Sequence, residues 1–271
     1  MSNLFSVKNK IIMVSGATGI LGKAIAKHLA SEGAQVIILG RSPEKVNTLV
    51  QEIKDEGGFA HPAIADVTQE DQLNELFGEL SKAFEVLDVL INAAGGNMPG
   101  AVVMPNQFLT DLSGDDVRKI MDLNYMGTFL PTKVFLPLMT ETKVGSVINI
   151  SSMAATRPMT RVMGYASAKA AVDNLTKWLA TEFARKYGEG MRVNAVAPGF
   201  FLTEQNRTLL TNPDGSLTER GNLIIQNTPM ARFGSPDELF GAIQFLCSDA
   251  SKFVTGTIIE VDGGFNAFSG V

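Results

Sequence analysis

The sequence predicts an α/β protein built on a doubly wound parallel sheet of about seven strands, with helices on both faces. Short apolar runs rich in β-branched residues alternate with longer helical stretches along the chain. Hydrophobic residues make up 45% of the 271 residues, which is enough for a core on each side of one sheet. We therefore expect a single domain over residues 1–271.

The predicted strands and helices follow one another in a regular order. Strands are expected over Ile11 to Val14, Gln35 to Leu39, Ala60 to Ala65, Val86 to Ile91, Val147 to Ile150, Arg192 to Val196 and Thr257 to Val261. Helices are expected over Ile20 to Glu32, Pro43 to Glu56, Gln69 to Phe84, Gly114 to Met139, Val162 to Tyr187 and Pro236 to Ser248. Ser235-Pro-Asp-Glu is a typical helix start, because it combines a cap with proline and acids in the first turn.

Two stretches between these elements have the composition of loops, Gly95 to Leu112 and Gly199 to Pro229. Both follow the carboxyl ends of strands, where open parallel sheets bind their ligands. We therefore expect both to border the active cleft, and residues 199–229 to form a lid over the substrate.

Composition and charge narrow the classes of function. A net charge of −5 gives no indication of nucleic-acid binding, and no apolar run approaches ~18 residues, so no membrane span is expected. The start of the chain lacks a signal-peptide pattern and Cys247 is the only cysteine, so we predict a reduced, cytoplasmic setting. We expect no metal site, because His28 and His61 lie away from the motifs below and are interpreted as structural.

A glycine-rich turn near the start of the chain indicates a nucleotide site. Gly16, Gly19 and Gly22 lie between the first predicted strand and the first predicted helix. Glycines there let the backbone approach a pyrophosphate, and the helix amino terminus favours its negative charge. The same pattern is compatible with a tight strand–helix turn that binds nothing.

A second motif carries acid–base chemistry. Tyr165 and Lys169 are four residues apart on a predicted helix and share one face. An ammonium beside a phenol favours phenolate, so we expect Lys169 to lower the pKa of Tyr165. Ser152 follows the strand Val147 to Ile150, where its hydroxyl can hydrogen-bond a substrate carbonyl. Taken singly, the Tyr–Lys pair is compatible with an ordinary surface pair and Ser152 with a turn cap.

In this order, the three motifs resemble the short-chain dehydrogenase/reductase family. Asn92-Ala-Ala-Gly95 is similar to its Asn-Asn-Ala-Gly turn, and Val261-Asp-Gly-Gly264 to its closing strand and turn. The spacing Gly16-x-x-Gly19-x-x-Gly22 departs from the Gly-x-x-x-Gly-x-Gly of the compact branch, which the rest of the chain resembles. The resemblance implies a Rossmann-type fold and an NAD(P)-dependent oxidoreductase that transfers a hydride between nicotinamide and a carbonyl or secondary alcohol.

The resemblance also implies roles for individual residues. Tyr165 would exchange the proton, Lys169 would also hold the ribose, Ser152 would polarise the carbonyl, and Asn124 would steady a proton-carrying water. The alternative for Asn124 is a helix-kink asparagine bonded to the backbone. The implied cofactor-binding residues are Gly16, Thr18, Gly19, Ile20, Gly22, Arg41, Ser42, Asp66, Val67, Asn92, Ala93, Gly95, Tyr165, Lys169, Pro198, Gly199 and Thr203.

The end of the second strand favours NADP. A carboxylate at this point would bind the ribose diol of NAD and repel a 2′-phosphate. Gly40 stands where that acid is expected, and Arg41 and Ser42 offer a grip on a phosphate instead. We predict NADP as the cofactor and keep NAD open.

The predicted substrate is a sugar acid. The loop Pro198 to Arg207 and the tail after Gly263 are similar to those of sugar-acid reductases of the gluconate 5-dehydrogenase and D-mannonate oxidoreductase kind. One of several arginines would pair with the carboxylate, although each alone is compatible with a solvated surface residue. The candidate substrate residues are Asn97, Arg157, Arg161, Gln205 and Arg207, with Asn206 as a further hydroxyl partner.

Two other functions stay open. One is a 3-oxoacyl reductase acting on acyl-carrier thioesters, which needs a basic docking patch, and the run Lys177 to Lys186 offers little of one. The other is a redox sensor that binds NAD(P) without catalysis. The resemblance further implies a homotetramer, which pairs the helices Gly114 to Met139 and Val162 to Tyr187 and buries the last strand.

Overall fold

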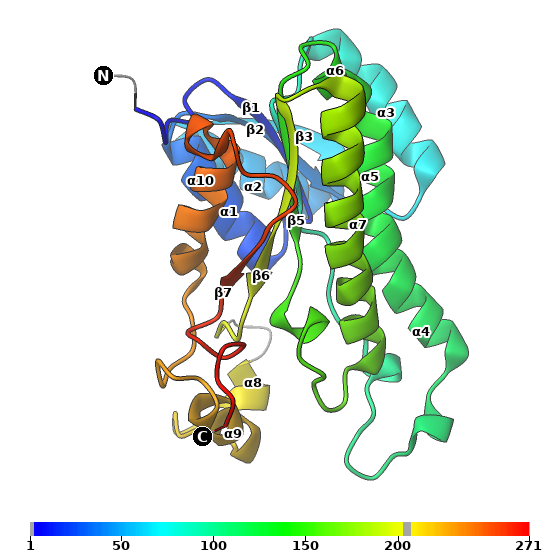
Figure 1. The fold of residues 1–271 in the computed structure, drawn as a ribbon, viewed down its shortest axis with the longest axis vertical. Helices are drawn as coiled ribbons and strands as arrows, with labels where there is room; N and C mark the ends of the chain where they lie inside the picture. The colour runs from blue at the N-terminus through cyan, green and yellow to red at the C-terminus, as the bar shows by residue number, and fades with distance from the viewer. Residues whose placement is uncertain (1–2, 203–206, 271) are drawn as a thin grey trace.

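The computed structural model describes residues 3–202 and 207–270, and its centre is one parallel sheet (Figure 1). The strands run in the order β3-β2-β1-β4-β5-β6-β7, and every neighbouring pair is parallel. Their bounds are β1 Ile11–Ser15, β2 Gln35–Gly40, β3 Phe59–Ile64, β4 Val89–Asn92, β5 Gly145–Ile150, β6 Met191–Pro198 and β7 Ile258–Val261. The predicted doubly wound fold is therefore confirmed.

Helices cover both faces of this sheet. In Figure 1, α1 (Ile20–Ser31), α2 (Pro43–Asp55) and α10 (Phe240–Cys247) lie on one side of the strands. On the other side lie α3 (Glu70–Ala83), α5 (Gly127–Phe135) and α7 (Met163–Tyr187). Layers of this kind arise because each helix connects two parallel strands and packs on a face of the sheet as it does so.

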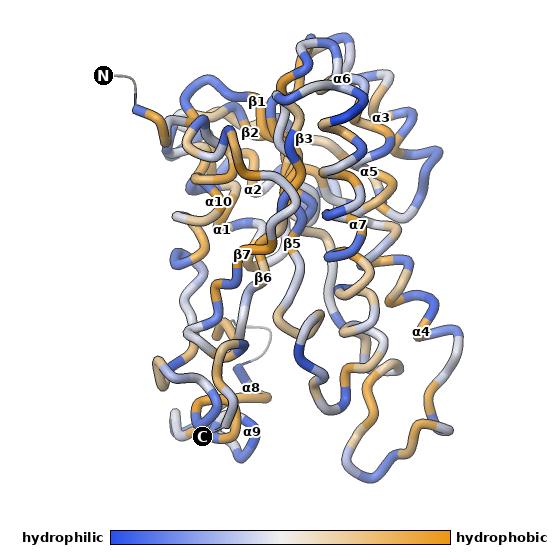
Figure 2. Tube along the Cα trace, in the orientation of Figure 1, coloured by the Kyte–Doolittle hydropathy of each residue, from blue (hydrophilic) through white to orange (hydrophobic). Residues whose placement is uncertain are grey.

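Two cores flank the sheet because neighbouring residues of a strand point to opposite faces. Ile12 and Val14 of β1 belong to the core shared with α1, α2 and α10, whereas Met13 belongs to the core shared with α3, α5 and α7. Figure 2 shows the hydrophobic residues gathered along the strands in the middle of the molecule. Strands that are buried on both faces read as continuous apolar runs, which explains their clear signal in the sequence.

From β1 the chain continues to β2 on one side of the sheet centre, and from β4 it continues to β5 on the other side. These two strands are neighbours, although β2 and β3 separate them in the sequence. Their outgoing connections diverge, so their carboxyl ends leave a crevice between them, which is where such sheets bind ligands. Gly16 follows β1 and Ala93 follows β4, so both motifs lie at this crevice.

The helix predicted over Gly114 to Met139 is not continuous. It consists of α4 (Gly114–Met121), a π-helical turn η3 (Asp122–Met126), α5 and α6 (Pro137–Thr140). Pro131 inside α5 offers no N–H, and Asn124 donates its side-chain amide to the Ile120 carbonyl at 3.0 Å. Both features disturb the regular ladder, and π turns of this kind gather at functional sites.

The two predicted loops contain short helices. The stretch after β4 forms the 3₁₀ turns η1 (Pro99–Ala101) and η2 (Leu109–Asp111). The predicted lid contains α8 (Arg207–Leu210) and α9 (Glu219–Gln226), whose start is capped by Thr218 accepting from the Gly221 amide at 3.1 Å. Further 3₁₀ turns are η4 (Met153–Ala155), η5 (Pro236–Leu239) and η6 (Asp249–Ser251).

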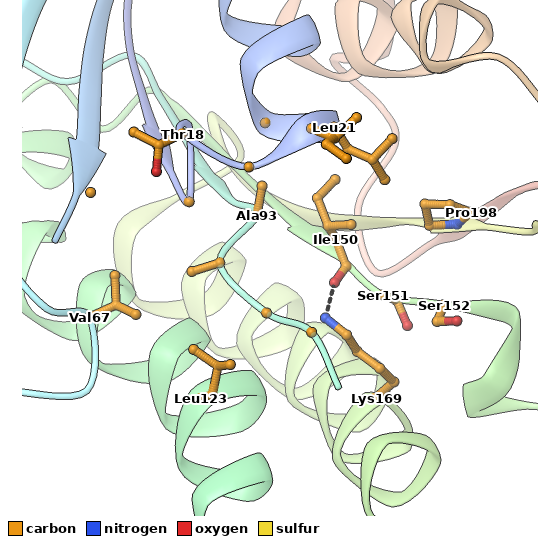
Figure 3. A pocket seen from close by; sticks show the side chains of 18 of the residues that line it. Thr18, Leu21, Val67, Ala93, Leu123, Ile150, Ser151, Ser152, Lys169 and Pro198 are labelled. Atoms are coloured by element: carbon orange, nitrogen blue, oxygen red, sulfur yellow. Dashed lines mark hydrogen bonds between the residues drawn. The ribbon is translucent and has the colours of Figure 1, made fainter. Parts of the chain in front are cut away.

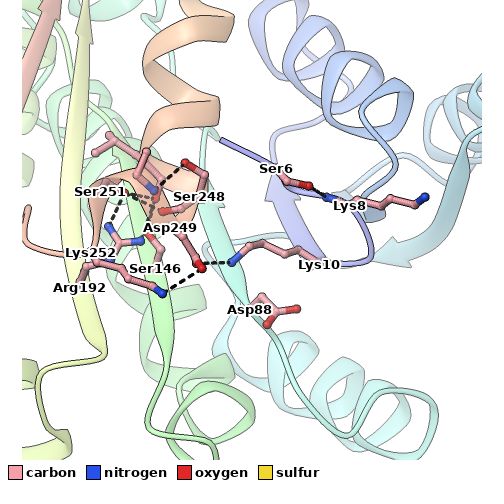
Figure 4. A network of polar contacts seen from close by, with 12 residues as sticks. Ser6, Lys8, Lys10, Asp88, Ser146, Arg192, Ser248, Asp249, Ser251 and Lys252 are labelled. Carbon is pink, nitrogen blue, oxygen red and sulfur yellow. Dashed lines mark hydrogen bonds and ion pairs between the residues drawn. The ribbon is translucent and has the colours of Figure 1, made fainter. Parts of the chain in front are cut away.

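A polar network fixes the opposite, amino-terminal edge of the sheet (Figure 4). Asp249 pairs with Lys252 at 3.0 Å and with Lys10 at 3.6 Å. The buried Arg192 donates to Ser251 Oγ at 2.9 Å and to the Leu246 carbonyl at 3.1 Å. These contacts hold η6 against the start of β6, so we interpret this edge as stabilising the fold and not as a binding site. Within residues 3–202 and 207–270, no helix has the length and apolarity needed to cross a membrane.

Candidate active site

A cleft of about 540 Å³ opens at the carboxyl ends of the strands. Figure 3 shows Thr18 and Val67 toward one end of it and Ser151, Ser152 and Lys169 toward the other. The lining side chains come from the glycine turn, the ends of the central strands, α7 and the start of the predicted lid. The predicted site residues among them are Gly16, Thr18, Gly19, Ile20, Gly22, Arg41, Asp66, Val67, Ala93, Gly95, Ser152, Tyr165, Lys169, Pro198 and Gly199.

Two positions of the glycine turn, Gly16 and Gly22, have no room for a side chain. Gly16 has a φ of +64°, and a Cβ there would lie 2.6 Å from the Cα of Ala94. A Cβ on Gly22 would lie 2.4 Å from the Gly16 carbonyl oxygen. The turn therefore packs backbone against backbone and leaves the amino end of α1 open to the cleft, which is the cradle that a pyrophosphate requires.

Lys169 is almost fully buried at the floor of the cleft. Its ammonium donates to the carbonyl oxygen of Ile150 at 2.7 Å (Figure 3). The Lys169 Nζ lies 5.7 Å from the centroid of the Tyr165 ring. Burial lowers the pKa of Lys169 to about 8, and Asp173 acts in the opposite direction. The ammonium therefore sits where it can lose or regain a proton near neutral pH.

The predicted direction of the Tyr165 pKa shift is wrong in this structure. Burial raises the pKa of the phenol, and a hydrogen bond with Ser152 offsets part of that rise. Desolvation disfavours the phenolate, and the sequence cannot reveal its size because it depends on what packs around the ring. Geometrically, Ser152, Tyr165 and Lys169 do share one cleft, as the sequence predicted.

Ser152 stands at the carboxyl end of β5, immediately before η4. Its hydroxyl oxygen accepts from the Ala154 amide at 3.1 Å, so it caps the 3₁₀ turn and keeps its own O–H for another acceptor. The neighbouring Ser151 donates to the carboxylate of Asp173, one turn beyond Lys169 on α7. The sequence analysis missed both residues: Ser151 lines the cleft, and Asp173 holds its hydroxyl from α7.

Asn124 bonds to the backbone of the cleft. Its amide donates to the carbonyls of Gly96 at 2.9 Å and Ile120 at 3.0 Å, and its carbonyl accepts from the Gly96 amide at 3.0 Å. A Cβ on Gly95 would lie 2.7 Å from Asn124 Oδ1 and 3.1 Å from Lys169 Nζ. Asn124 thus anchors the Gly95–Gly96 segment beside Lys169, which agrees with the alternative reading of a kink asparagine.

Two predicted cofactor residues, Ser42 and Asn92, have other placements. Ser42 does not line the cleft and caps α2 by accepting from the Lys45 amide at 3.4 Å. Asn92 is buried below the cleft and donates to Thr132 Oγ1 and Asn149 Oδ1, each at 2.9 Å. Thr203 lies outside the described residues.

The candidate substrate residues are scattered. Arg157 is engaged by the carboxy-terminal tail, since it donates to the Asn266 and Phe268 carbonyls. Asn97 is exposed and accepts from the Met98 amide at 3.0 Å. Arg207 is exposed at the start of α8, Arg161 is half-buried before α7, and Gln205 and Asn206 lie outside the described residues.

Apolar side chains that the sequence analysis did not assign also line the cleft. They include Leu21, Leu123, Ile150, Phe200 and Phe201. Phe200 contacts the Phe265 ring edge-on, with centroids 5.3 Å apart, so the start of the lid packs on the carboxy-terminal tail. The position of Phe200 directly after Pro198-Gly199 was the one signal that could have indicated it.

A family model described as enoyl-(acyl carrier protein) reductase matches residues 16–266. The chain belongs to the short-chain dehydrogenase/reductase family. As a short-chain dehydrogenase/reductase it is an oxidoreductase that acts on CH–OH groups, as its motifs implied.

Several members of the short-chain dehydrogenase/reductase family resemble it over their full lengths. It is 40% identical over 275 residues to the uncharacterized oxidoreductase UxuB of Bacillus subtilis (strain 168), with 98% of each chain covered. A 3-oxoacyl-[acyl-carrier-protein] reductase of Thermotoga maritima is 33% identical, with 95% of this chain and 98% of the relative covered.

Solved structures agree closely with the fold. A provisionally assigned D-mannonate oxidoreductase from Haemophilus influenzae, with bound NAD, has a TM-score of 0.92 and 38% identity, with 99% of this chain and 100% of that chain covered. A gluconate 5-dehydrogenase from Burkholderia cenocepacia, in complex with NADP and tartrate, has a TM-score of 0.86 and 32% identity, with 98% of each chain covered.

Proposed function

We propose that this protein is an NAD(P)-dependent oxidoreductase that interconverts a sugar acid and its keto form. The observation that carries the proposal is the meeting of Ser152, Tyr165 and Lys169 with the glycine turn in one cleft. The turn can bind the pyrophosphate of a dinucleotide, and the three polar residues can carry out acid–base catalysis on a carbonyl. Relatives named for D-mannonate and gluconate chemistry support the substrate class.

In the proposed mechanism the nicotinamide, when bound, supplies or accepts the hydride, and the chain handles the proton. The Ser152 hydroxyl donates a hydrogen bond to the carbonyl oxygen, which polarises it. Tyr165 gives its phenolic proton to that oxygen as the alcohol forms, and takes it back in the reverse direction. The ammonium of Lys169 then stabilises the phenolate, because a nearby positive charge favours the ionised phenol.

Lys169 has a second proposed role, which its position supports. Its Nζ donates to the Ile150 carbonyl at 2.7 Å and lies 5.7 Å from the centroid of the Tyr165 ring, so we propose that it holds ribose hydroxyls while it stabilises the phenolate. Asn124 has the proposed role of fixing the Gly95–Gly96 backbone beside Lys169, so that a water relay to solvent keeps one geometry.

We propose NADP as the preferred cofactor and keep NAD as a second possibility. No carboxylate stands at the end of β2, where Gly40 lies, and the exposed Arg41 faces the cleft. A guanidinium there suits a 2′-phosphate. Asp66 lines the cleft farther along, where its carboxylate accepts from the Thr68 amide and hydroxyl at 2.9 and 2.7 Å and shapes the turn after β3.

The remaining parts of the proposal concern the lid, the assembly and the location. We propose that residues 199–229, with α8 and α9, close over the substrate within a single domain. We also propose a homotetramer, supported by the exposed Trp178 on α7 and by β7, which pairs only with β6 among the described strands. A cytoplasmic location stays a prediction.

A substrate panel tests the proposed function. The purified protein is assayed for oxidation of NADPH and of NADH with D-fructuronate, 5-keto-D-gluconate, neutral ketoses and an acetoacetyl thioester. The proposal predicts that a keto acid of sugar size has the highest kcat/KM. Preference for the thioester would support the acyl-carrier reductase, which the Thermotoga maritima relative favours. Stoichiometric NADPH binding without turnover of any carbonyl would support the redox sensor.

A further inference from the structure

The carboxy-terminal tail, residues 264–270, is bound by an arginine that follows the turn at Ser152. Arg157 comes directly after η4, which Ser152 caps. Its Nε donates to the backbone carbonyl of Asn266 at 3.1 Å and to the side-chain Oδ1 of the same residue at 3.0 Å. Its Nη2 donates to the Phe268 carbonyl at 3.3 Å. A planar guanidinium that binds several neutral oxygens at once fixes the position of the tail as well as its distance.

Asn266 is held from the other side by β7 and the residue after it. Its backbone amide donates to the Asp262 carboxylate at 2.7 Å, and its side-chain amide donates to the Glu260 carboxylate. Thr156 adds a hydrogen bond from its hydroxyl to Asn266 Oδ1 at 3.1 Å. The N–H groups of Asn266 therefore bind the end of the sheet, and its oxygens bind Thr156 and Arg157. The tail is a bridge between β7 and the segment that follows Ser152.

The residues on either side of this bridge touch both ends of the proposed lid. Phe200 lines the cleft at the start of the lid, and its ring packs edge-on against the Phe265 ring, with centroids 5.3 Å apart. Just beyond the other end, the Met230 amide donates to the Gly263 carbonyl at 3.1 Å. A displaced tail would therefore take away the packing partner of Phe200, which is part of the cleft wall.

We propose that Arg157 is a positioning residue, which fixes the tail and through Phe265 holds Phe200 as a wall of the substrate cleft. The inference rests on the proposed function and deepens it, because it names the wall that would confine the sugar acid beside Ser152. Arg157 acts on the substrate only through this wall, since its guanidinium is already bound to the tail. Side chains that contact a substrate keep one geometry when packing and hydrogen bonds behind them restrict their rotamers. Loss of Arg157 should therefore weaken substrate binding more than the chemical step.

Hydrogen–deuterium exchange of the unliganded protein tests the link between Arg157 and Phe200 without requiring turnover. The reporters are the amides of Gly199, Met230 and Asn266, which all donate to residues 261–263. Peptides that contain these amides should exchange about tenfold faster or more in Arg157→Gln, as expected when a charged hydrogen bond to the tail is lost. Peptides from β1 should exchange at the wild-type rate, because the expected change is local.

Two further variants control this measurement. A lysine donates to carbonyl oxygens but lacks the planar fork, so Arg157→Lys should exchange at rates between those of wild type and Arg157→Gln. Arg185→Gln removes an exposed arginine in the last turn of α7 and should exchange like the wild type. If Arg157→Gln does not fold, Arg157→Lys and Phe265→Leu carry the same comparison.

Steady-state kinetics connect the link to the substrate, with D-fructuronate or 5-keto-D-gluconate, whichever the panel favours. Arg157→Gln should raise KM about tenfold, and Phe265→Leu, which leaves Arg157 intact, about three- to tenfold. In both variants kcat should stay within about threefold, because the groups that exchange the proton are unchanged. The double variant should raise KM by less than the product of the single effects, because both act through one tail.

The outcomes separate this inference from the proposed function. Unchanged exchange at Gly199 in Arg157→Gln, or faster exchange with an unchanged KM, would overturn the inference. A higher KM in Arg157→Gln while Phe265→Leu behaves as wild type would mean that Arg157 contacts the substrate, and would also overturn it. Faster exchange at Gly199 in both variants without turnover of any sugar acid would uphold the link between Arg157 and Phe200 and reject the proposed reaction.

Discussion

Replacing Lys169 by methionine should change the pH dependence of stability in a defined direction. The pKa of this ammonium is about 8 in the folded chain and 10.5 in the reference state, because burial disfavours the charge. Below about pH 8 both states carry the proton, and the folded state bears the full cost of the buried charge. Between about pH 8 and 10.5 the folded state releases the proton first, so the wild type gains stability as pH rises.

The magnitude follows from the two pKa values. Their difference, at about 1.36 kcal/mol per pKa unit, corresponds to about 3 kcal/mol. The charged group that opposes the shift is Asp173, and Tyr165 faces Lys169 as a neutral phenol. In Lys169→Met the titrating group is gone, so the free energy of unfolding of wild type minus variant should rise by up to about 3 kcal/mol from pH 7 to pH 10.5.

Urea unfolding at several pH values measures this difference. The protein concentration is held constant, because subunit association would otherwise contribute to the apparent stability. Lys82→Met, which removes an exposed lysine in the last turn of α3, serves as the control and should give a nearly flat difference. A flat or falling difference for Lys169→Met would refute the assignment of a lowered pKa to the buried ammonium.

Two substitutions and one mass measurement test other parts of the account. Arg41→Ala should raise KM for NADPH about tenfold or more, since a charged contact contributes about 1.5–3 kcal/mol, and should leave KM for NADH nearly unchanged. Steady-state kinetics with both cofactors measure this, and an equal rise in KM for NADPH and for NADH would contradict a phosphate contact. Gly95→Ala places a Cβ 2.7 Å from Asn124 Oδ1 and should cost about 1–3 kcal/mol of stability together with activity; wild-type urea unfolding would show that the packing there is loose. Light scattering at micromolar concentration should give the mass of four 29.0 kDa chains, and a monomer would contradict the proposed assembly.

The fold could be predicted because its signals are local. Each strand that is buried on both faces is a continuous apolar run, and the turn at Gly16 to Gly22 lies directly between a strand and a helix. The break in the helix predicted over Gly114 to Met139 was missed, because Pro131 lies inside the continuous helix α5 and does not mark the π turn at Asp122–Met126. Its amphipathic pattern continues across the π turn, so the pattern does not reveal that the hydrogen-bond register changes.

The site was predicted where motifs specify it and missed where distant segments meet. The grouping of Ser152, Tyr165 and Lys169 follows from strand and helix positions alone. The engagement of Arg157 depends on a tail 109 residues farther along the chain. Desolvation of Tyr165 also depends on three-dimensional packing, which is why the sequence predicted the wrong direction for its pKa shift.

The central claim is that Tyr165 exchanges the proton in this cleft, and Tyr165→Phe tests it most directly. The ring and its packing remain, and only the phenolic proton is lost. The account predicts that the dissociation constant of NADPH stays within about twofold, while kcat for the best carbonyl of the panel falls about 10²–10⁴-fold, as expected for loss of general acid catalysis. A variant that keeps more than about a tenth of the wild-type rate would contradict the account.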